Sequence, residues 1–229
     1  MPLYLGNGID IILYIIAAAL VLLAQAKVQS AYQKYREVET IKGMTGAEVA
    51  QTILLQNGVN DVTVQRATGG SLSDHYDPRN KTVNLSADIY QGRSIAAVAV
   101  AAHEVGHAIQ HNVGYGFLTF RNMIAPLASI SSTLSFPILF LGLFTRVDAF
   151  FTIGLILFMG AAVFQLITLP VEFNASARAL KILDTQGFLV ADEVNDAKKM
   201  LTAAALTYVA GLANSIIQII RILGMRNRR

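Results

Sequence analysis

Two histidines and a glutamate stand at a spacing that can bind a metal ion. In the run His103-Glu104-Val105-Gly106-His107, the histidines are four residues apart, which on an α-helix places them on one face, about 6 Å apart along the axis. Both imidazoles can then reach one Zn²⁺ at about 2.0–2.1 Å. The carboxylate of Glu104 could take a proton from a zinc-activated water as a general base. The pattern predicts a catalytic zinc site.

A catalytic zinc also needs a third protein ligand and an open position for water. The metzincin pattern requires a histidine six residues after His107, but valine holds that position. His111 continues the same helix face, yet it lies about 12 Å along the axis from His103, so both cannot bind one ion. We predict instead that Glu172 is the third ligand, in the first turn of a helix opened by Pro170.

The composition of the chain points to a membrane protein. Of 229 residues, 54% are hydrophobic and only 14% are charged, and the mean hydropathy is +0.49. Soluble domains carry about 25% charged residues, so an ordinary soluble protein and a disordered one are both excluded. There is no cysteine, which excludes a disulfide-stapled domain and thiol chemistry. The net charge of +3 is small, and basic residues beside apolar stretches suit an anionic membrane surface better than nucleic acid.

Three apolar stretches have the length of a membrane span, which takes about 20 helical residues. They are Ile9–Ala26, Met123–Phe144 and Ala149–Pro170, and only four residues separate the last two. This spacing predicts a transmembrane hairpin. A fourth stretch, Leu201–Leu223, contains several polar residues, and it could either span the membrane or lie along its surface.

The distribution of basic residues predicts the orientation of the chain. Nine Lys or Arg residues lie between Lys27 and Arg121, whereas residues 1–8 contain none. Because basic loops stay in the cytoplasm, residues 27–121 should be cytoplasmic and the N-terminus should be outside. The hairpin then returns the chain to the cytoplasm at Glu172, on the side of His103.

The polar segment contains signals for helices and for short strands. A capping box at Thr45 and Glu48 predicts the start of a helix that ends at Asn57. A second predicted helix runs from the N-cap candidate Ser94 through His111. Between these helices lie three β-like runs, Val62–Gln65, Leu72–Tyr76 and Thr82–Ser86, and a turn at Asp77–Asn80 predicts a hairpin of the last two. Thr82–Ser86 is expected to be an edge strand that pairs with an extended substrate.

A peptidase must also stabilise the oxyanion of its reaction, commonly with a His or Tyr donor. The candidates of this type are His75, Tyr76, Tyr115 and Tyr208. Each tyrosine could instead be an amphipathic residue at the membrane interface, where tyrosine is enriched. We single out His75 and Tyr208 as catalytic candidates.

The chain resembles, over nearly its whole length, the YugP-like family of membrane zinc metallopeptidases, which is similar to the HtpX-like membrane proteases. The resemblance implies a zinc-dependent endopeptidase of the gluzincin type in the plasma (inner) membrane of a bacterium. It implies His103, His107 and Glu172 as zinc ligands and Glu104 as the general base. The segments that carry the resemblance are Ser73–Pro78, Val100–Gln110, Pro170–Ser176 and Ala204–Ala210.

One position departs from the related pattern. The HtpX-like enzymes usually have an aspartate four residues after the third ligand, but this chain has Ser176, and the nearest polar neighbour is Asn174. A carboxylate that orients a ligand imidazole could come instead from Asp74, Asp77 or Asp88. The spacing alone does not choose among these three.

These observations predict an α-helical membrane protein with a small α+β zincin-like catalytic domain, built from the His-Glu-x-x-His helix and a short β-hairpin or sheet. The predicted parts are an N-terminal transmembrane anchor (1–26), the first part of a cytoplasmic metalloprotease domain (27–122), a transmembrane hairpin (123–170), a third-ligand helix that completes the catalytic domain (171–200), and a fourth apolar helix with a basic tail (201–229).

The predicted function is that of a membrane-bound zinc endopeptidase with Zn²⁺ as cofactor. Its partners would be the lipid bilayer and a peptide or membrane-protein substrate, and not nucleic acid. One alternative is a non-catalytic membrane scaffold that retains a zinc site. Glu104 argues against it, because a structural site needs no general base and is usually closed by four protein ligands. A second alternative is a metal-dependent hydrolase of a lipid-linked substrate.

Overall fold

The structure is a computed structural model that describes residues 8–70 and 73–226. The chain divides into two compact units. We call the first the helical unit (residues 1–25, 120–169 and 207–229) and the second the mixed unit (residues 26–119 and 170–206). Three parts of the predictions fall outside the described residues: the start of the N-terminal anchor, Leu72 of the predicted second strand, and the end of the basic tail.

Four long apolar helices account for most of the described residues. They are α1 (Gly8–Arg36), α5 (Gly116–Thr145), α6 (Asp148–Thr185) and α7 (Ala191–Arg226). By length and composition, each of the four is able to cross a membrane. The three stretches that the sequence predicts as membrane spans therefore each lie in a helix of suitable length. The fourth stretch, Leu201–Leu223, also lies in such a helix, α7.

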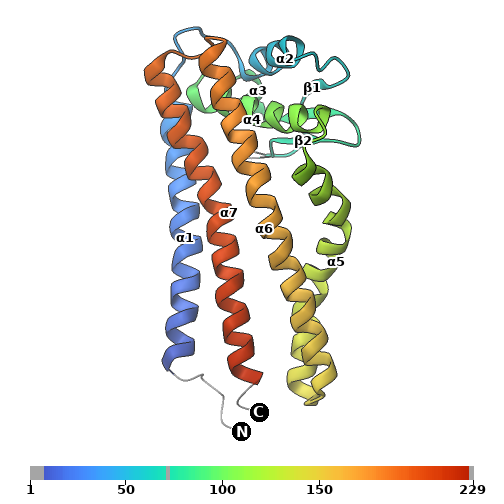
Figure 1. Cartoon of the computed structure of the whole chain (residues 1–229). Helices are drawn as coiled ribbons and strands as arrows, with labels where there is room; N and C mark the ends of the chain where they lie inside the picture. The colour runs from blue at the N-terminus through green and yellow to red at the C-terminus, as the bar shows by residue number, and fades with distance from the viewer. Residues whose placement is uncertain (1–7, 71–72, 227–229) are drawn as a thin grey trace. The chain divides into compact units, whose positions relative to one another are not determined.

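Within the helical unit, α5 and α6 run side by side up to the turn that joins them (Figure 1). A Cβ atom added to Gly154 of α6 would lie 2.7 Å from Leu139 of α5, so the missing side chain lets the two helices approach closely. Ile222 of α7 packs against a cluster formed by these two helices. The hydroxyl of Ser215 in α7 donates a hydrogen bond to the Gln165 side chain, at 2.9 Å. Packing and a partly buried polar contact therefore join α7 to the hairpin.

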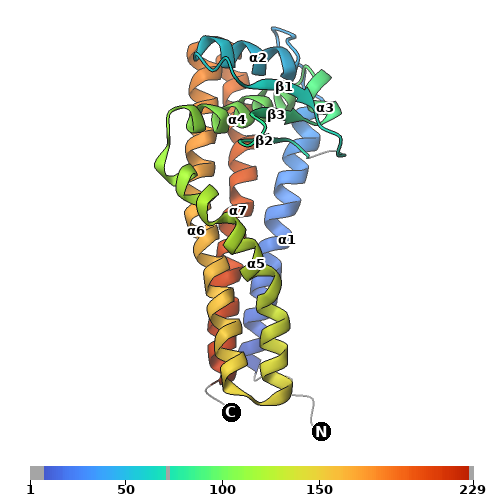
Figure 2. The same cartoon turned by 90° about the vertical axis from the view of Figure 1, so that its right-hand side faces the viewer.

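The mixed unit contains a small three-stranded sheet beside two helices (Figure 2). The helix α2 (Gly46–Gln56) has the predicted capping box at its start, and α4 (Ile95–Asn112) begins after Ser94, whose hydroxyl accepts a hydrogen bond from the Ala97 amide. A short helix, α3 (Ala87–Gln91), lies between the sheet and α4 in the chain. The sequence predicts both α2 and α4, and the structure confirms these two helices.

The order of the strands corrects one prediction. The strands β1 (Thr63–Arg66), β2 (His75–Asp77) and β3 (Thr82–Leu85) lie in the order β1-β3-β2. The predicted hairpin of β2 and β3 is confirmed as an antiparallel pair. However, β3 is central and not an edge strand, because β1 pairs with it in parallel on its other side. Its buried apolar side chains, Val83 and Leu85, belong to the hydrophobic core of the mixed unit.

The structure also corrects the start of the helix that carries Glu172. Pro170 lies inside the continuous helix α6 and does not open a new helix. A proline removes one backbone N–H from the helix ladder, and membrane helices tolerate this loss. The helix ends later, at Thr185, and Gly187 follows with a positive φ of 66°, which suits glycine just after a helix end. The predicted helix over 171–200 is therefore divided between α6 and α7.

Candidate metal centre

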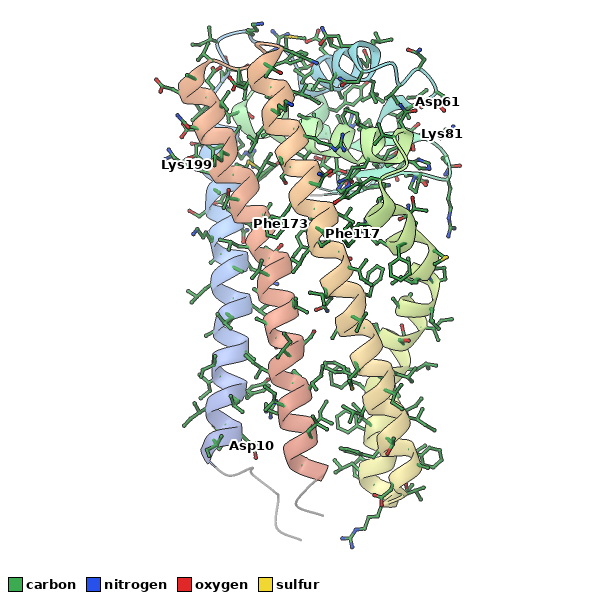
Figure 3. All side chains as sticks on the ribbon, in the orientation of Figure 1. Asp10, Asp61, Lys81, Phe117, Phe173 and Lys199 are labelled. Carbon is green, nitrogen blue, oxygen red and sulfur yellow. The ribbon has the colours of Figure 1, made fainter. Side chains whose placement is uncertain are left out.

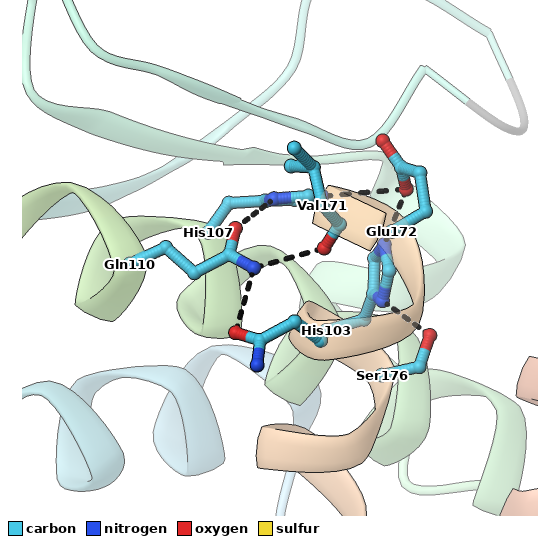
Figure 4. Close-up of polar contacts among 7 residues, drawn as sticks. His103, His107, Gln110, Val171, Glu172 and Ser176 are labelled. Atoms are coloured by element: carbon cyan, nitrogen blue, oxygen red, sulfur yellow. Dashed lines mark hydrogen bonds and ion pairs between the residues drawn. The ribbon is translucent and has the colours of Figure 1, made fainter. Parts of the chain in front are cut away.

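Two helices of the mixed unit bring together the three residues that the sequence predicts as zinc ligands. His103 and His107 lie one turn apart on α4, and Glu172 lies on α6. One Glu172 oxygen, Oε2, is 3.4 Å from His103 Nε2 and 3.5 Å from His107 Nε2. The ligand atoms of the three residues all lie within 4.8 Å of one another. Figure 4 shows both imidazoles and the carboxylate turned toward a common point.

These distances fit a tetrahedral zinc ion. Ligands about 2.0–2.1 Å from the centre of a tetrahedron lie about 3.4 Å from one another, which agrees with the separations of Glu172 Oε2 from the two imidazole nitrogens. Two nitrogens and one carboxylate oxygen are a donor set that zinc accepts, and three protein ligands leave a fourth position open. Over residues 8–70 and 73–226, no other group of three His, Cys, Asp or Glu side chains is arranged in this way.

The site is largely closed to solvent and is rich in negative charge. Glu172 is only 3% exposed, and Glu104 and His107 are also buried. Burial alone would lower the pKa of His107, but a hydrogen bond to Glu172 and the nearby Glu104 carboxylate outweigh it, so this pKa is raised. Burial raises the pKa of Asp74, and the charge of Glu104 raises it further. The carboxylates therefore favour a positive charge at this point, which is what a cation site needs.

The far nitrogen of each imidazole contacts a neutral side chain. The Nδ1 atom of His107 is 3.0 Å from the amide oxygen of Gln110, and that of His103 is 3.1 Å from the hydroxyl of Ser176 (Figure 4). A donor–acceptor contact of this kind orients a metal-binding histidine and fixes which nitrogen faces the metal. The contacts leave Nε2 of both rings directed at Glu172.

The three aspartates considered as orienting carboxylates have other partners. Asp74 accepts hydrogen bonds from the backbone N–H and the hydroxyl of Ser86. Asp77 accepts hydrogen bonds from backbone N–H groups of the turn that follows it. A carboxylate oxygen of Asp88 lies 4.0 Å from a guanidinium nitrogen of Arg36. The serine that replaces the expected aspartate, Ser176, itself contacts the candidate ligand His103.

The remaining histidine of α4 stays outside the metal group, as predicted. His111 is exposed, and its Nδ1 is 2.7 Å from the hydroxyl of Tyr76 in β2. Burial raises the pKa of Tyr76 to about 12, with additional contributions from Asp61 and Asp77. The phenol is therefore protonated at neutral pH and is able to donate a hydrogen bond.

Two predicted catalytic candidates are not part of the ligand group. His75 is exposed at the start of β2, and its Nδ1 lies 2.8 Å from the backbone carbonyl of Ser73. Tyr208 belongs to α7 in the helical unit. The roles of both residues in oxyanion stabilisation stay predictions.

Sequence reasoning missed one residue of this site, Gln110. It is fully buried and hydrogen-bonded on both sides of its amide. A signal for it was present, because Gln110 lies three residues after His107, and residues at this spacing are neighbours on a helix.

Comparison with known proteins supports the chemistry of this donor set. Residues 10–227 match a family described as "Putative neutral zinc metallopeptidase". A protein of Bacillus subtilis (strain 168), "Putative membrane protease YugP", is 48% identical over 212 residues, which cover 92% of this chain and 93% of the relative. No solved structure was found to match the chain.

Proposed function

The chain belongs to this family of neutral zinc metallopeptidases, and on that premise we propose that it is a membrane-bound endopeptidase that hydrolyses peptide bonds near the cytoplasmic membrane surface. The observation that carries the proposal is the group formed by His103, His107 and Glu172. Three protein ligands suit a catalytic zinc, whereas a structural zinc is usually closed by four. We assign the two histidines and Glu172 as the zinc ligands.

The proposed mechanism gives each residue one task. His103, His107 and Glu172 would hold the zinc ion, which would act as a Lewis acid and lower the pKa of a bound water. Glu104, buried on α4 next to the first ligand, is the general base. Its carboxylate takes a proton from the attacking water and delivers it to the nitrogen of the leaving amine.

The sheet suggests how a substrate chain is held. Among the described strands, β2 pairs only with β3, so its other edge has no strand partner there, and it packs against α4. An extended peptide that pairs with this edge would lie along the helix of the ligands. His75 of β2 and Tyr208 of α7 are the donors that we propose for the oxyanion.

The position of Glu172 in the chain supports a site close to the membrane. Glu172 follows the apolar run of α6 by only two residues. Its neighbour Phe173 is 48% exposed, and Phe117 at the start of α5 is 50% exposed; Figure 3 labels both side chains. Exposed phenylalanine side chains are among those that enter the boundary between headgroups and acyl chains of a bilayer. With the basic residues of 27–121 inside the cell, the membrane surface concerned would be the cytoplasmic one.

The test is the substitution Glu104→Gln in detergent-purified full-length protein. It should abolish cleavage of casein and self-cleavage while bound zinc stays unchanged, because the ligands are untouched and only the proton acceptor is lost. Glu37→Gln, at an exposed glutamate of the mixed unit, is the matched control and should keep both properties.

Two outcomes would favour the other functions. Zinc binding without peptide cleavage in either protein would indicate a scaffold. Release of product from lipid-linked substrates, lost in Glu104→Gln, would indicate a hydrolase of another class. In either case the proposed endopeptidase activity would be wrong, although the metal site would remain.

A further inference from the structure

A row of hydrogen bonds that leads to His107 starts at an arginine whose bonding direction is fixed. The Nε atom of Arg178 donates to the side-chain oxygen Oδ1 of Asn174, at 2.7 Å. A guanidinium group has no acceptor atom, so the Asn174 amide must turn its oxygen toward the arginine. Arg178 therefore determines which way the asparagine amide points.

The next amide in the row, that of Gln110, is oriented from two sides. Its Nε2 atom donates to Asn174 Oδ1 at 3.0 Å and to the backbone carbonyl of Val171 at 2.8 Å. Both partners are acceptors, so the reverse orientation would bring oxygen against oxygen. Gln110 is completely buried, so bulk solvent does not reach its amide to relieve such a contact. Its Oε1 atom must face His107.

The direction of these bonds settles the proton on the ligand. Because Gln110 Oε1 can only accept, His107 must carry its proton on Nδ1, at 3.0 Å from that oxygen. The lone pair of the neutral ring is then on Nε2, the atom that faces Glu172 at 3.5 Å. A histidine binds zinc through a nitrogen that carries a lone pair, and the bond at its other nitrogen selects it.

We propose that Gln110 is a positioning residue that fixes His107 as the tautomer whose Nε2 binds zinc, with its own orientation set by Val171 and by the Arg178–Asn174 pair. The proposal rests on the assignment of His107 as a zinc ligand. A neutral amide makes the imidazole a weaker ligand than a carboxylate would, so orientation and not added charge is the contribution of Gln110.

The experiment measures zinc affinity of the full-length protein in detergent by competition with a chelator. Gln110→Leu keeps the approximate volume but removes the acceptor, and it should weaken zinc binding by about 10–100-fold. Arg178→Met should weaken zinc binding less than Gln110→Leu does, because the Val171 carbonyl still holds the Gln110 amide. Arg178→Lys, which keeps a donor, should bind zinc more tightly than Arg178→Met. The exposed Arg79 provides the matched control, Arg79→Met, which should leave zinc affinity unchanged.

A second measurement covers the case in which Gln110→Leu does not fold. The chain has only four histidines, so ¹⁵N-histidine labelling gives a simple spectrum of the zinc-loaded protein. His107 should show zinc on Nε2 and a slowly exchanging proton on Nδ1, and exchange of this proton should become faster in Arg178→Met. Zinc on Nδ1, or unchanged affinity in Gln110→Leu together with unchanged exchange in Arg178→Met, would overturn the proposal.

These outcomes are separate from the test of the proposed function. If the protein binds zinc as described but cleaves no peptide, the endopeptidase is refuted and the role of Gln110 remains. If Glu104→Gln abolishes cleavage while the Gln110 and Arg178 variants bind zinc normally, the function remains and the positioning role is refuted.

Discussion

Gly106 and Ala175 lie so close together that a Cβ atom added to the glycine would be 2.8 Å from the Ala175 carbonyl oxygen. Gly106 directly precedes the candidate ligand His107 on α4, and Ala175 lies between Glu172 and Ser176 on α6. The missing side chain therefore lets the two helices approach closely at the point where their candidate metal-binding residues meet. The glycine in the His-Glu-x-x-His motif has a packing role at this site.

We predict that Gly106→Ala weakens both folding and zinc binding. The added methyl group overpacks a tight contact, which typically costs about 1–3 kcal/mol, and the separation of the helices moves Glu172 away from the histidines. Thermal unfolding with and without zinc measures the first effect, and chelator competition measures the second.

The control for this substitution is Gly211→Ala in α7. A Cβ atom at Gly211 would meet nothing within 4 Å, and alanine is the better helix former by about 1 kcal/mol. This variant should be as stable as the parent protein or more so. Equal losses in the two variants would show that the contact with Ala175 has no special importance.

A second prediction concerns the ligands themselves. His103→Ala, His107→Ala and Glu172→Ala should each reduce zinc affinity by more than the roughly 10–100-fold that loss of an outer hydrogen bond costs. His111→Ala should have no such effect, because His111 is bonded to Tyr76 and lies outside the ligand group. Metal analysis of purified protein checks all four, and full zinc occupancy in Glu172→Ala would refute Glu172 as third ligand.

The grouping of His103, His107 and Glu172 was predictable from sequence because helix periodicity and the coordination shell of a zinc ion impose strict geometry. Four residues on a helix fix the separation of His103 and His107, and the ends of the predicted spans limited where an acidic partner could return. The capping box of α2, the hairpin and the apolar helices follow from equally local patterns. The capping box, the hairpin and the helices each depend on residues that are close together in the chain, and only Glu172 had to be placed from the order of the predicted spans.

What sequence reasoning missed depends on contacts between distant residues. The pairing of β1 with β3 is a parallel contact across a crossover, and no turn signal marks it. The partners of the histidines were sought among carboxylates, whereas a glutamine and a serine occupy those positions. Pro170 looked like a helix start because a proline inside a helix is costly in water, but it is tolerated in an apolar helix.

A third prediction follows from the hydroxyl that contacts His103. Ser176→Asp should tighten zinc binding, because a carboxylate at Nδ1 makes the imidazole a stronger ligand. Ser176→Ala should weaken it, because the Nδ1 proton loses its partner at 3.1 Å. Chelator competition gives the order Asp, Ser, Ala in decreasing affinity. The same affinity in all three would mean that the serine has no influence on the ligand.

The fourth prediction concerns topology and uses the absence of cysteine in this chain. A cysteine that replaces Thr145, at the end of α5, should react with an impermeant thiol reagent added to intact cells. A cysteine that replaces Asn57, after α2, should react only after lysis. The unmodified chain gives the background. The opposite labelling pattern would place the metal site outside the cell and reverse the argument from basic residues.

The last prediction joins the chemistry of the site to its place in the chain. Glu172 follows the apolar run of α6 by two residues, so a zinc ion that it shares with His103 and His107 would lie close to the membrane surface. A peptide anchored in the same bilayer is then held at a high local concentration beside the metal, whereas a free peptide must arrive from solution. We expect a membrane-tethered peptide to be cleaved faster than the same peptide free in solution when both are supplied at equal concentration with protein in vesicles. In detergent, where the two no longer share one surface, most of the difference should disappear. Equal rates in vesicles would refute the membrane-proximal position of the site but would leave the zinc chemistry intact.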